Sequence, residues 1–498
     1  MSNEKKQPNP RETTVLLAVL KFVPLLIFAL LVIWAQLDLL IAAPIASMAA
    51  IVVAMYVNRL DFDGVFEFGL KSGASIVQVF FILMFAYGVA ECFMATGVGA
   101  VVINLALAAG VTGKTIAVVA LLVTCVLSIA TGSSWGTFAA CAPIFLWLNY
   151  IIGGDVVLTL GAIAGGSCFG DNIGMISDTT VLSCGMQDIK IIDRVKHQGV
   201  WSVLAIIVSV IIFFVLSMNQ PGTQGNIQDA LNNIPAEAYA ALEEERPGAL
   251  ILLGQVAEGG TPIYMIIPLV LVIATAFMGL NTMLCLGSGM VSALILGYAA
   301  GTCTLEQWLN DLLLVGFGDA GGWSIVMMLW VAAFGGIMNS MNAFEPLAKL
   351  IVMVSGKVRH LMSWCGVLCL VGNVALADET AQIATISPIV RNIVEENVEG
   401  SEEDMYKLRV RLATYNDALG VYGSELIPWH CFPVFFAGIA DAVYPIFPGG
   451  ITTTQIIMNN FTSMVMVVSI ILLSFTGWDR FIPGFGIPRE PAVTLKKK

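Results

Sequence analysis

The chain has 498 residues, of which 58% are hydrophobic and only 12% are charged, and its formal net charge is −12 at pH 7. Together with a mean hydropathy of +0.87, this composition excludes a soluble globular protein of the same length. Ionisable side chains at membrane depth cost roughly 2.5 to 3.5 kcal/mol each on insertion scales, so those that are retained there usually have a function.

Long uncharged runs predict most of the membrane-spanning helices. A polar N-terminus with Lys5, Lys6 and Arg11 precedes an apolar run that lacks a small-residue cleavage pattern, so this run is expected to remain as an anchor. Further uncharged runs are near or above the roughly 20 residues that cross a bilayer, and they cover residues 39–58, 72–90, 115–154, 199–218 and 451–477. We therefore expect an all-α polytopic membrane protein with about 11 to 13 helical segments, some of them broken.

Polar interruptions recur in the two halves of the chain at matching distances. Ser133 and Asp171 are 38 positions apart, as are Asp378 and Asn416, and the Pro143 segment Ala-Pro-Ile matches Ser-Pro-Ile at an offset of 245. Further upstream, residues 88–91 resemble residues 336–339 at an offset of 248. This pattern predicts two inverted-topology repeats with broken or re-entrant helices.

The repeats divide the chain into five regions. We expect an N-terminal tail and scaffold helices in residues 1–71, a first repeat with broken helices in 72–199, linking helices and an acidic external loop in 200–321, a second repeat with broken helices in 322–450, and a C-terminal helix with a basic tail in 451–498.

Lysine and arginine in short loops set the orientation of a membrane protein, whereas acidic residues contribute little. Residues 220–260 are rich in glutamate and are interpreted as a solvated external linker, and residues 395–411 as a solvated loop. Both termini and two further basic segments are interpreted as cytoplasmic, and these segments contain Lys190, Arg194 and Lys196, then Lys407, Arg409 and Arg411, and finally Lys496 to Lys498.

The interruptions suggest where a cation could bind. Glycine, proline, serine and asparagine inside a span unwind the helix, and the freed backbone is tolerated only where protein or a water-filled cavity covers it. The carbonyl ends of such half-helices coordinate cations such as sodium. Hard cations prefer oxygen ligands, which carboxylates, hydroxyls and amides supply.

The sodium-binding candidates are the carboxylates of Asp171, Asp178 and Asp378, with Glu379 and Glu91 as further ion- or proton-binding groups. The residues expected to line the site are Ser133, Ser134, Thr137, Asn172, Ser177, Thr179, Thr180, Asn416, Asp417 and Trp429.

Structural roles compete with several of these assignments. Asp178 and Asp171 could cap helix N-termini. Glu91 could pair with Lys114 or a hydroxyl, Asp417 and Glu425 could face water, and Trp135, Trp429 and His430 could serve packing or a helix end.

Cofactor chemistry has little support in the sequence. The ten cysteines are scattered through apolar runs and the three histidines form no helical pair with one another or with cysteine. We therefore expect neither a disulfide framework nor a haem or zinc site, and no cofactor besides a transported or coupling sodium ion and proton.

The polar segments resemble those of the NhaC-type sodium/proton antiporters of the ion transporter superfamily. The resemblance covers most of the chain and rests on Thr131-Gly-Ser-Ser-Trp-Gly-Thr137, Phe169-Gly-Asp-Asn-Ile-Gly-Met-Ile-Ser-Asp-Thr-Thr180, the break at Asp378, and Ile427-Pro-Trp429. It implies a secondary transporter of the bacterial or archaeal inner membrane, whose broken segments meet at a midplane site. The better-known antiporters read Gly-Asp-Lys-Met-Ser-Pro-Leu-Ser-Asp-Thr-Thr, whereas Asn172 here replaces the lysine.

The expected function is exchange of sodium for protons by alternating access, because one buried carboxylate can hold either ion but not both. The loss of the lysine leaves the solute open. The alternative is a sodium- or proton-coupled carrier of an amino acid or small organic acid, a solute class assigned to other members of the broader family. The expected partners are the lipid bilayer, sodium and protons, without nucleic acid, and a homodimer remains one option.

Two other classes fit the sequence less well. An intramembrane aspartyl protease would need a Gly-x-Gly-Asp signature, which Cys168 interrupts. An ion channel would need filter repeats or an arginine-rich voltage-sensing helix, and the sequence contains neither. We therefore expect a transporter and not an enzyme.

Overall fold

The computed structural model describes residues 14–74, 76–175, 177–222, 225–245 and 247–496. The basic residues predicted to mark the N-terminal tail lie outside these residues. Within the described part, nine helices are long and apolar enough to cross a membrane, or ten when one bent pair is counted as a span. The expectation of an all-α polytopic membrane protein is confirmed.

Each half of the chain begins with a set of scaffold helices. In the first half these are α1 (Val15–Ala29) with its π-helical end η1 (Leu30–Trp34), α2 (Leu39–Asn58), α3 (Phe62–Gly73), α4 (Ile76–Ala95) and α5 (Val98–Ala108). In the second half they are η3 (Ile263–Ile266), α15 (Ile267–Phe277), α16 (Thr282–Ala300), α17 (Leu305–Gln307), η4 (Trp308–Leu313), α18 (Leu314–Ala320), α19 (Trp323–Ser340) and α20 (Glu345–Val354).

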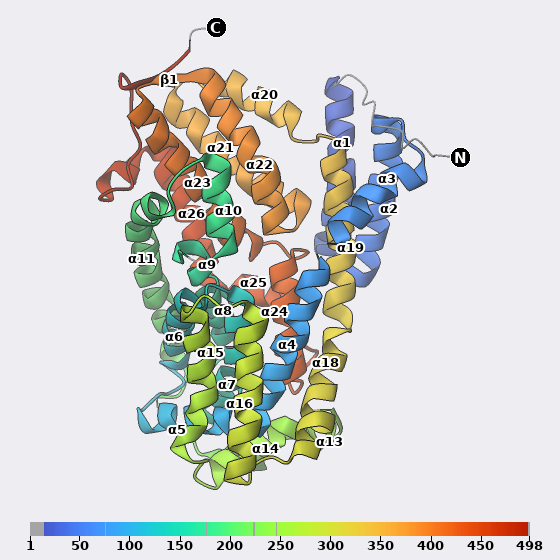
Figure 1. Ribbon diagram of the computed structural model, residues 1–498, viewed down its shortest axis with the longest axis vertical. Helices are drawn as coiled ribbons and strands as arrows, with labels where there is room; N and C mark the ends of the chain where they lie inside the picture. Colours follow the sequence, from blue (N-terminus) through green and yellow to red (C-terminus); the bar gives the residue numbers. More distant parts are fainter. Residues whose placement is uncertain (1–13, 75, 176, 223–224, 246, 497–498) are drawn as a thin grey trace.

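The two scaffold sets run in opposite directions. The α3–α4 segment descends from the upper part of Figure 1 to α5 at the lower end, whereas the α17–α19 segment rises from the lower end to α20 at the top. Helix α4 packs along α18, and α3 packs along α19. The scaffold helices of each half therefore pack against those of the other half, as expected for inverted repeats.

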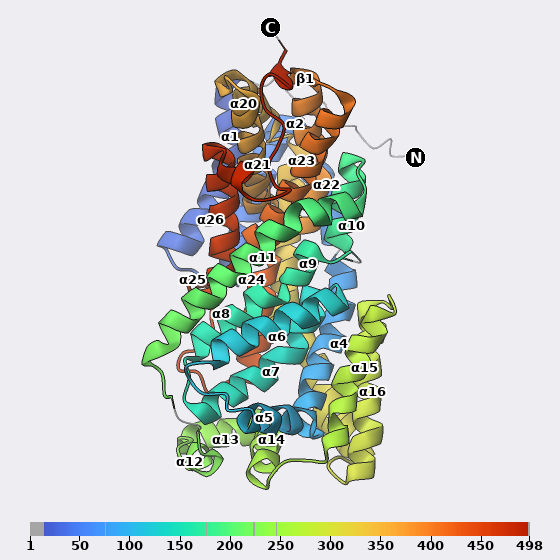
Figure 2. The same ribbon diagram turned by 90° about the vertical axis from the view of Figure 1, so that its left-hand side faces the viewer.

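Two helical hairpins follow the scaffolds. Helices α6 (Ile116–Thr131) and α7 (Ser134–Ile152) form the first, in the lower half of Figures 1 and 2. Helices α21 (Val358–Leu376) and α22 (Glu379–Asn397) form the second, in the upper half of both views.

The tips of the two hairpins have the same geometry. The first helix ends at a left-handed residue in each, Gly132 (φ 62°) or Ala377 (φ 55°), which is a common helix C-cap. The next residue caps the second helix: the Ser133 hydroxyl accepts from Gly136 N and the Asp378 carboxylate from Ala381 N. The predicted offset of 245 therefore aligns equivalent backbone positions.

Two broken spans complete the centre of the molecule. In the first, α8 (Val156–Ser167) and α9 (Phe169–Ile173) are separated from α10 (Asp178–Gln187) by a non-helical break. In the second, α23 (Glu402–Ser424) breaks before α24 (Cys431–Val443). Beside them lie α11 (Ile191–Leu216) with its short end η2 (Ser217–Asn219), and the pair α25 (Thr453–Asn459) and α26 (Phe461–Thr476), which is bent by 60°.

Two loop predictions need correction. The linker contains α12 (Ile227–Asn232), α13 (Ala236–Glu245) and α14 (Pro247–Ala257), and α14 buries Leu252 and Leu253 against the bundle instead of being solvated. Residues 402–411 belong to α23 and not to a loop, and Arg411 is fully buried. Its guanidinium contacts the carboxylate of Asp479 in the C-terminal segment, since the long stem and planar head suit buried ion pairs.

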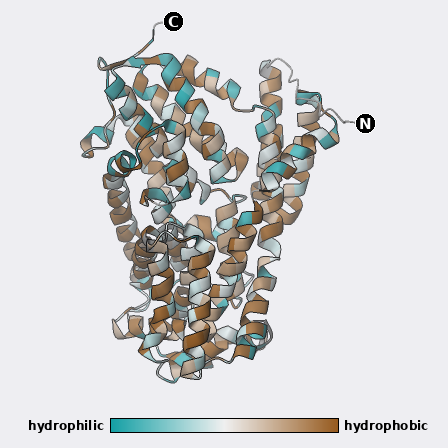
Figure 3. Ribbon diagram, viewed as in Figure 1, coloured by the Kyte–Doolittle hydropathy of each residue, from teal (hydrophilic) through white to brown (hydrophobic). Residues whose placement is uncertain are grey.

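The C-terminal segment closes the upper end. After η5 (Trp478–Phe481), strand β2 (Val493–Leu495) pairs antiparallel with β1 (Val398–Gly400). Figure 3 shows hydrophobic residues dominating α15 and α16, with hydrophilic residues more frequent around the upper helices. The predicted basic segments at residues 190–196, at the start of α11, and 407–411, in α23, lie towards the upper end of the molecule, opposite α12 to α14 (Figures 1 and 2).

Candidate functional site

The candidate site lies where the hairpin tips reach the breaks of the two spans. At the first tip, Ser134 N donates to Oδ2 of Asp171 over 3.1 Å. At the second tip, the carbonyl of Ala377 accepts from the backbone N–H of Cys431 over 3.3 Å, at the start of α24. Each hairpin is therefore hydrogen-bonded to the broken span of its own repeat.

Asp171 is held at the end of α8–α9 by polar groups that carry no charge. Its Oδ1 accepts from the Ser177 hydroxyl at 2.9 Å, in addition to the bond from Ser134 N to Oδ2. Its backbone carbonyl accepts from the hydroxyls of Thr179 (3.3 Å) and Thr180 (3.1 Å). The side chain is 6% exposed, and none of the described basic residues forms an ion pair with it. A carboxylate in this position is oriented but not neutralised by a neighbouring positive charge.

Arg194 is the buried basic residue at the centre. Its guanidinium forms an ion pair with Asp417, and both side chains are fully buried. It also donates to the carbonyl of Asn172 over 2.6 Å, to the Thr180 hydroxyl over 2.8 Å and to Gln198 over 3.0 Å. Arg194 therefore connects the end of α9 in the first repeat to α23 in the second.

Arg194 is among the basic residues predicted to mark a cytoplasmic segment, but it is a fully buried residue of α11. Sequence signals for its burial exist, because Arg194, Gln198, Ser202 and Ser209 form a polar stripe with helical spacing along α11. The Ser202 hydroxyl donates to Oδ1 of Asn172 over 2.8 Å. Counting basic residues alone does not reveal which of them face the protein interior.

Further carboxylates surround Asp171. Glu379 is 7% exposed, its Oε2 accepts no hydrogen bond from the described residues, and it interacts electrostatically with Asp171, Asp378, Asp417 and Glu425. The side chains of Asp417 and Glu425, which could have faced water, are 0% and 1% exposed. The site therefore contains more buried carboxyl groups than basic side chains among the residues that the structure places.

Two candidate carboxylates are not part of this buried cluster, although Asp178 is close enough to Asp171 to interact with it electrostatically. Asp178 is exposed at the first position of α10, where its charge is favourable at the helix N-terminus. Glu91 is buried on α4 near the lower end, where its carboxylate faces Gly248 of α14. The structure therefore does not bring Glu91 together with Asp171.

The other predicted lining residues mainly organise the backbone. The Thr137 hydroxyl donates to the Ser133 carbonyl (2.9 Å), and Nδ2 of Asn416 donates to the Leu412 carbonyl (2.9 Å). Trp429 is 3% exposed, its indole N–H donates to the carbonyl of Val374 (2.9 Å) and its ring packs 5.1 Å from that of Phe28. These contacts are those of a buried packing residue and do not indicate that Trp429 lines an ion site.

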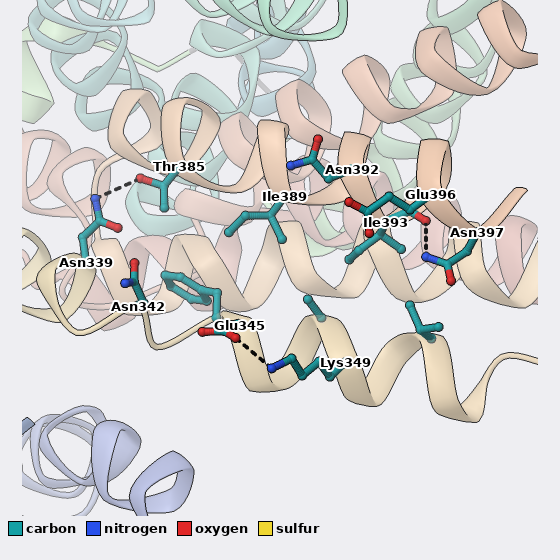
Figure 4. A pocket seen from close by; sticks show the side chains of 13 residues that line it. Asn339, Asn342, Glu345, Lys349, Thr385, Ile389, Asn392, Ile393, Glu396 and Asn397 are labelled. Atoms are coloured by element: carbon teal, nitrogen blue, oxygen red, sulfur yellow. Dashed lines mark hydrogen bonds and ion pairs between the residues drawn. The ribbon is translucent and has the colours of Figure 1, made fainter. Parts of the chain in front are cut away.

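A polar crevice opens at the upper end of the molecule between α19, α20 and α22 (Figure 4). Its volume is about 700 Å³, and a neighbouring cavity of about 670 Å³ shares Asn339 and Asn342 with it. Asn339 donates to the Thr385 hydroxyl over 3.2 Å, on the helix that begins at Glu379. Asn339 is exposed, whereas Glu91, its equivalent in the first repeat, is covered. The surface around Asn339 in the second repeat is therefore open, whereas the equivalent surface around Glu91 in the first repeat is covered.

Comparison with known proteins identifies similar chains. The model of a family described as the Na+/H+ antiporter family matches residues 11–185 and 166–478. An arginine/ornithine antiporter, ArcD, of Halobacterium salinarum is 22% identical over 384 residues, which cover 73% of this chain and 71% of the relative.

Two further relatives differ in the solutes that their names give. A malate-2H+/Na+-lactate antiporter of Bacillus subtilis is 25% identical over 384 residues, with 72% of each chain covered. The Na+/H+ antiporter NhaC of Alkalihalophilus pseudofirmus is 22% identical over 334 residues, with 64% of this chain and 67% of the relative covered. The predicted resemblance to NhaC-type antiporters is confirmed.

The Arg194–Asp417 pair gives a first prediction. Arg194→Gln or Asp417→Asn leaves one buried partner without the other, which is expected to cost about 3 to 5 kcal/mol. The double substitution removes both charges and should recover a large part of this loss. Thermal unfolding of the four purified proteins in detergent measures the coupling. Additive effects of the two substitutions would show that the pair does not act as a unit.

Proposed function

The chain belongs to the Na+/H+ antiporter family, and on this basis we propose that it exchanges sodium for protons across the membrane through its buried central carboxylates. The observation that supports this most directly is Asp171, a buried carboxylate at a helix break whose hydrogen-bond partners among the described residues are all neutral. The family membership makes it a multi-pass membrane transporter.

Exchange of sodium for protons follows from the fact that no described basic side chain forms an ion pair with Asp171. A charged carboxylate in a low-dielectric interior is costly unless a cation or a proton neutralises it. Sodium and a proton require the same oxygen atoms, so one displaces the other. Ser134 N and the Ser177 hydroxyl hold the carboxylate in place for either ion. Glu379, which interacts with Asp171, would receive or deliver the proton.

Alternating access requires that the site open to one side at a time. The crevice beside α22 supports a state that is open at the upper end, while α14 covers the equivalent surface at the lower end. Asp178 is exposed at the start of α10, and its charge would attract cations to the break between α9 and α10. In this proposal, movement of one repeat against the other closes the upper crevice and opens the lower surface.

The orientation is also a proposal. The upper end holds the basic residues of α23 and the C-terminal segment, which favours a cytoplasmic location for this end and for the termini. The membrane would be the inner membrane of a bacterium or archaeon. The expected partners are the lipid bilayer, sodium and protons; the proposal requires no cofactor or nucleic acid, and it fits a monomer or a homodimer.

A second candidate function is coupled transport of an amino acid or small organic acid. The relatives named as arginine/ornithine and malate/lactate antiporters support it. The crevice has amide and charged groups that could bind such a solute, including Asn342, Asn392, Glu345 and Lys349 (Figure 4). In this case sodium or a proton would bind at Asp171 and the solute in the crevice.

Transport by the reconstituted protein tests the proposal. In liposomes with an internal pH dye, a sodium gradient alone should move protons, and Asp171→Asn should reduce this flux to that of empty liposomes. The substitution retains the size of the side chain, its oxygen can still accept from Ser134 N, and the Ser177 hydroxyl can accept from the new amide, so the protein should still elute as a folded species. Glu258→Gln, at an exposed carboxylate, is the control with unchanged flux.

Two outcomes of this assay would change the conclusion. Flux that appears only with an added amino acid or organic acid would favour the second candidate function. Wild-type flux in Asp171→Asn would remove Asp171 from the site.

Access to the crevice gives another prediction. All ten native cysteines are buried, so the wild-type protein should react little with a membrane-impermeant thiol reagent. Asn339→Cys should react from one face only, whereas Glu91→Cys, at the equivalent position of the other repeat, should be protected in the same state. Labelling in oriented vesicles with mass-spectrometric detection measures both. Equal reaction of both variants would contradict a state open to one side.

A further inference from the structure

We propose that Glu425 is the centre of a second cation site, separate from Asp171, whose ligands come from the break after α23 and the bend between α25 and α26. Its preferred ion is a small monovalent cation such as sodium. The proposed exchange requires only the Asp171 site, so this inference goes beyond it.

Glu425 is held rigidly in the interior and has an unused oxygen. The side chain is 1% exposed. Its Oε2 accepts from Asn460 Nδ2 at 2.5 Å and from the Ser463 hydroxyl, whereas Oε1 accepts no hydrogen bond from the described residues. A buried carboxylate that is fixed through one oxygen presents the other as a ligand.

The electrostatic surroundings of Glu425 favour a cation. Glu425 is the C-cap residue of α23, where the helix dipole and the free carbonyls are negative. The side chains that interact electrostatically with Glu425 are acidic or weakly polar and include Cys168, Asp171 and Tyr422. No ion pair with Glu425 occurs among the residues that the structure describes.

The bend between α25 and α26 supplies further oxygen atoms. Asn460 lies at the bend, and its Oδ1 caps α26 by accepting from Ser463 N at 3.1 Å. The hydroxyl of Thr462 is fully buried and has no hydrogen-bond partner in the described part of the chain. Two unsatisfied buried oxygens, on Glu425 and Thr462, therefore occur around one bend.

Gly165 on α8 permits this close arrangement. A Cβ atom at this position would lie 2.6 Å from Oδ1 of Asn460, 2.6 Å from Cβ of Thr462 and 3.0 Å from its hydroxyl oxygen. Any larger residue would push α8 away from the bend. The oxygen atoms of Asn460 and Thr462 consequently lie on the same side, facing the glycine.

The ligand types define the class of ion. Carboxylate, amide and hydroxyl oxygens suit a hard cation, and a single carboxylate matches a single positive charge. No group of three or more His, Cys, Asp or Glu side chains suited to a metal occurs among the described residues, which argues against a transition metal. Since Asn460 and Ser463 contact Glu425 and belong to elements outside the Asp171 hydrogen bonds, the two sites can be tested separately.

Sodium binding to the purified full-length protein in detergent tests the inference. Bound radioactive sodium and sodium-dependent thermal stabilisation are measured against choline for the wild type and for Glu425→Gln, Thr462→Val and Asp171→Asn. Glu258→Gln serves as the control because it removes an exposed carboxylate. These measurements require no transport, so failure of sodium/proton exchange in liposomes would leave their result intact.

We expect Glu425→Gln and Thr462→Val each to raise the half-saturating sodium concentration of one component at least about tenfold, or about 1.4 kcal/mol. Asp171→Asn should retain that component and lose the other. Glutamine resembles a protonated glutamate, so wild-type sodium binding by Glu425→Gln would show that the carboxyl holds a proton and would overturn the proposal. Should Glu425→Gln fail to fold, unchanged binding by Thr462→Val would overturn it equally.

Discussion

The free energy of a buried carboxylate without a counter-ion is the constraint on which this structure depends. Asp171, Glu379, Asp417 and Glu425 are all buried, and Arg194 forms an ion pair with Asp417. Desolvation makes the remaining negative charge unfavourable unless a proton or a metal ion compensates it. This requirement makes the site a binding site for cations and explains why the surrounding contacts are mainly neutral hydrogen bonds. Arg194 has a different role, because it fixes the end of α9 to α23 and thereby sets the geometry in which the other carboxylates lie.

The helix breaks place these carboxylates at the ends of helices. Two hairpin tips with the same capping geometry, at Ser133 and Asp378, approach the broken spans. The arrangement supplies a backbone N–H to Asp171 at one tip, and it places Glu379 at the start of α22 at the other. The polar backbone of the breaks is covered by neighbouring helices, which satisfies the requirement for irregular structure within a membrane. The opposite directions of the scaffolds allow equivalent surfaces to be open at one end and covered at the other, and the crevice at Asn339 shows this asymmetry.

Much of this organisation could be predicted from the sequence. Apolar runs predicted the class of fold, and the offset of 245 predicted that Ser133 and Asp378 occupy equivalent positions in two repeats. The burial of Arg194, Arg411 and Glu425 was not predicted, because the direction in which a helical side chain points depends on which helices pack against it. The partners of Glu425 lie 35 and 38 positions away, at a bend between α25 and α26 that the apolar run 451–477 conceals. Local composition locates a helix break, but it does not indicate which distant side chains meet there.

The most direct measurement for the central claim is proton release during sodium binding by the purified protein in weakly buffered detergent solution. If Asp171 holds either a proton or a sodium ion, adding sodium must release protons as this site fills, and an equal addition of choline must release none. The release should diminish in Asp171→Asn because this side chain cannot exchange one ion for the other. Saturable sodium binding without proton release in the wild-type protein would contradict the account.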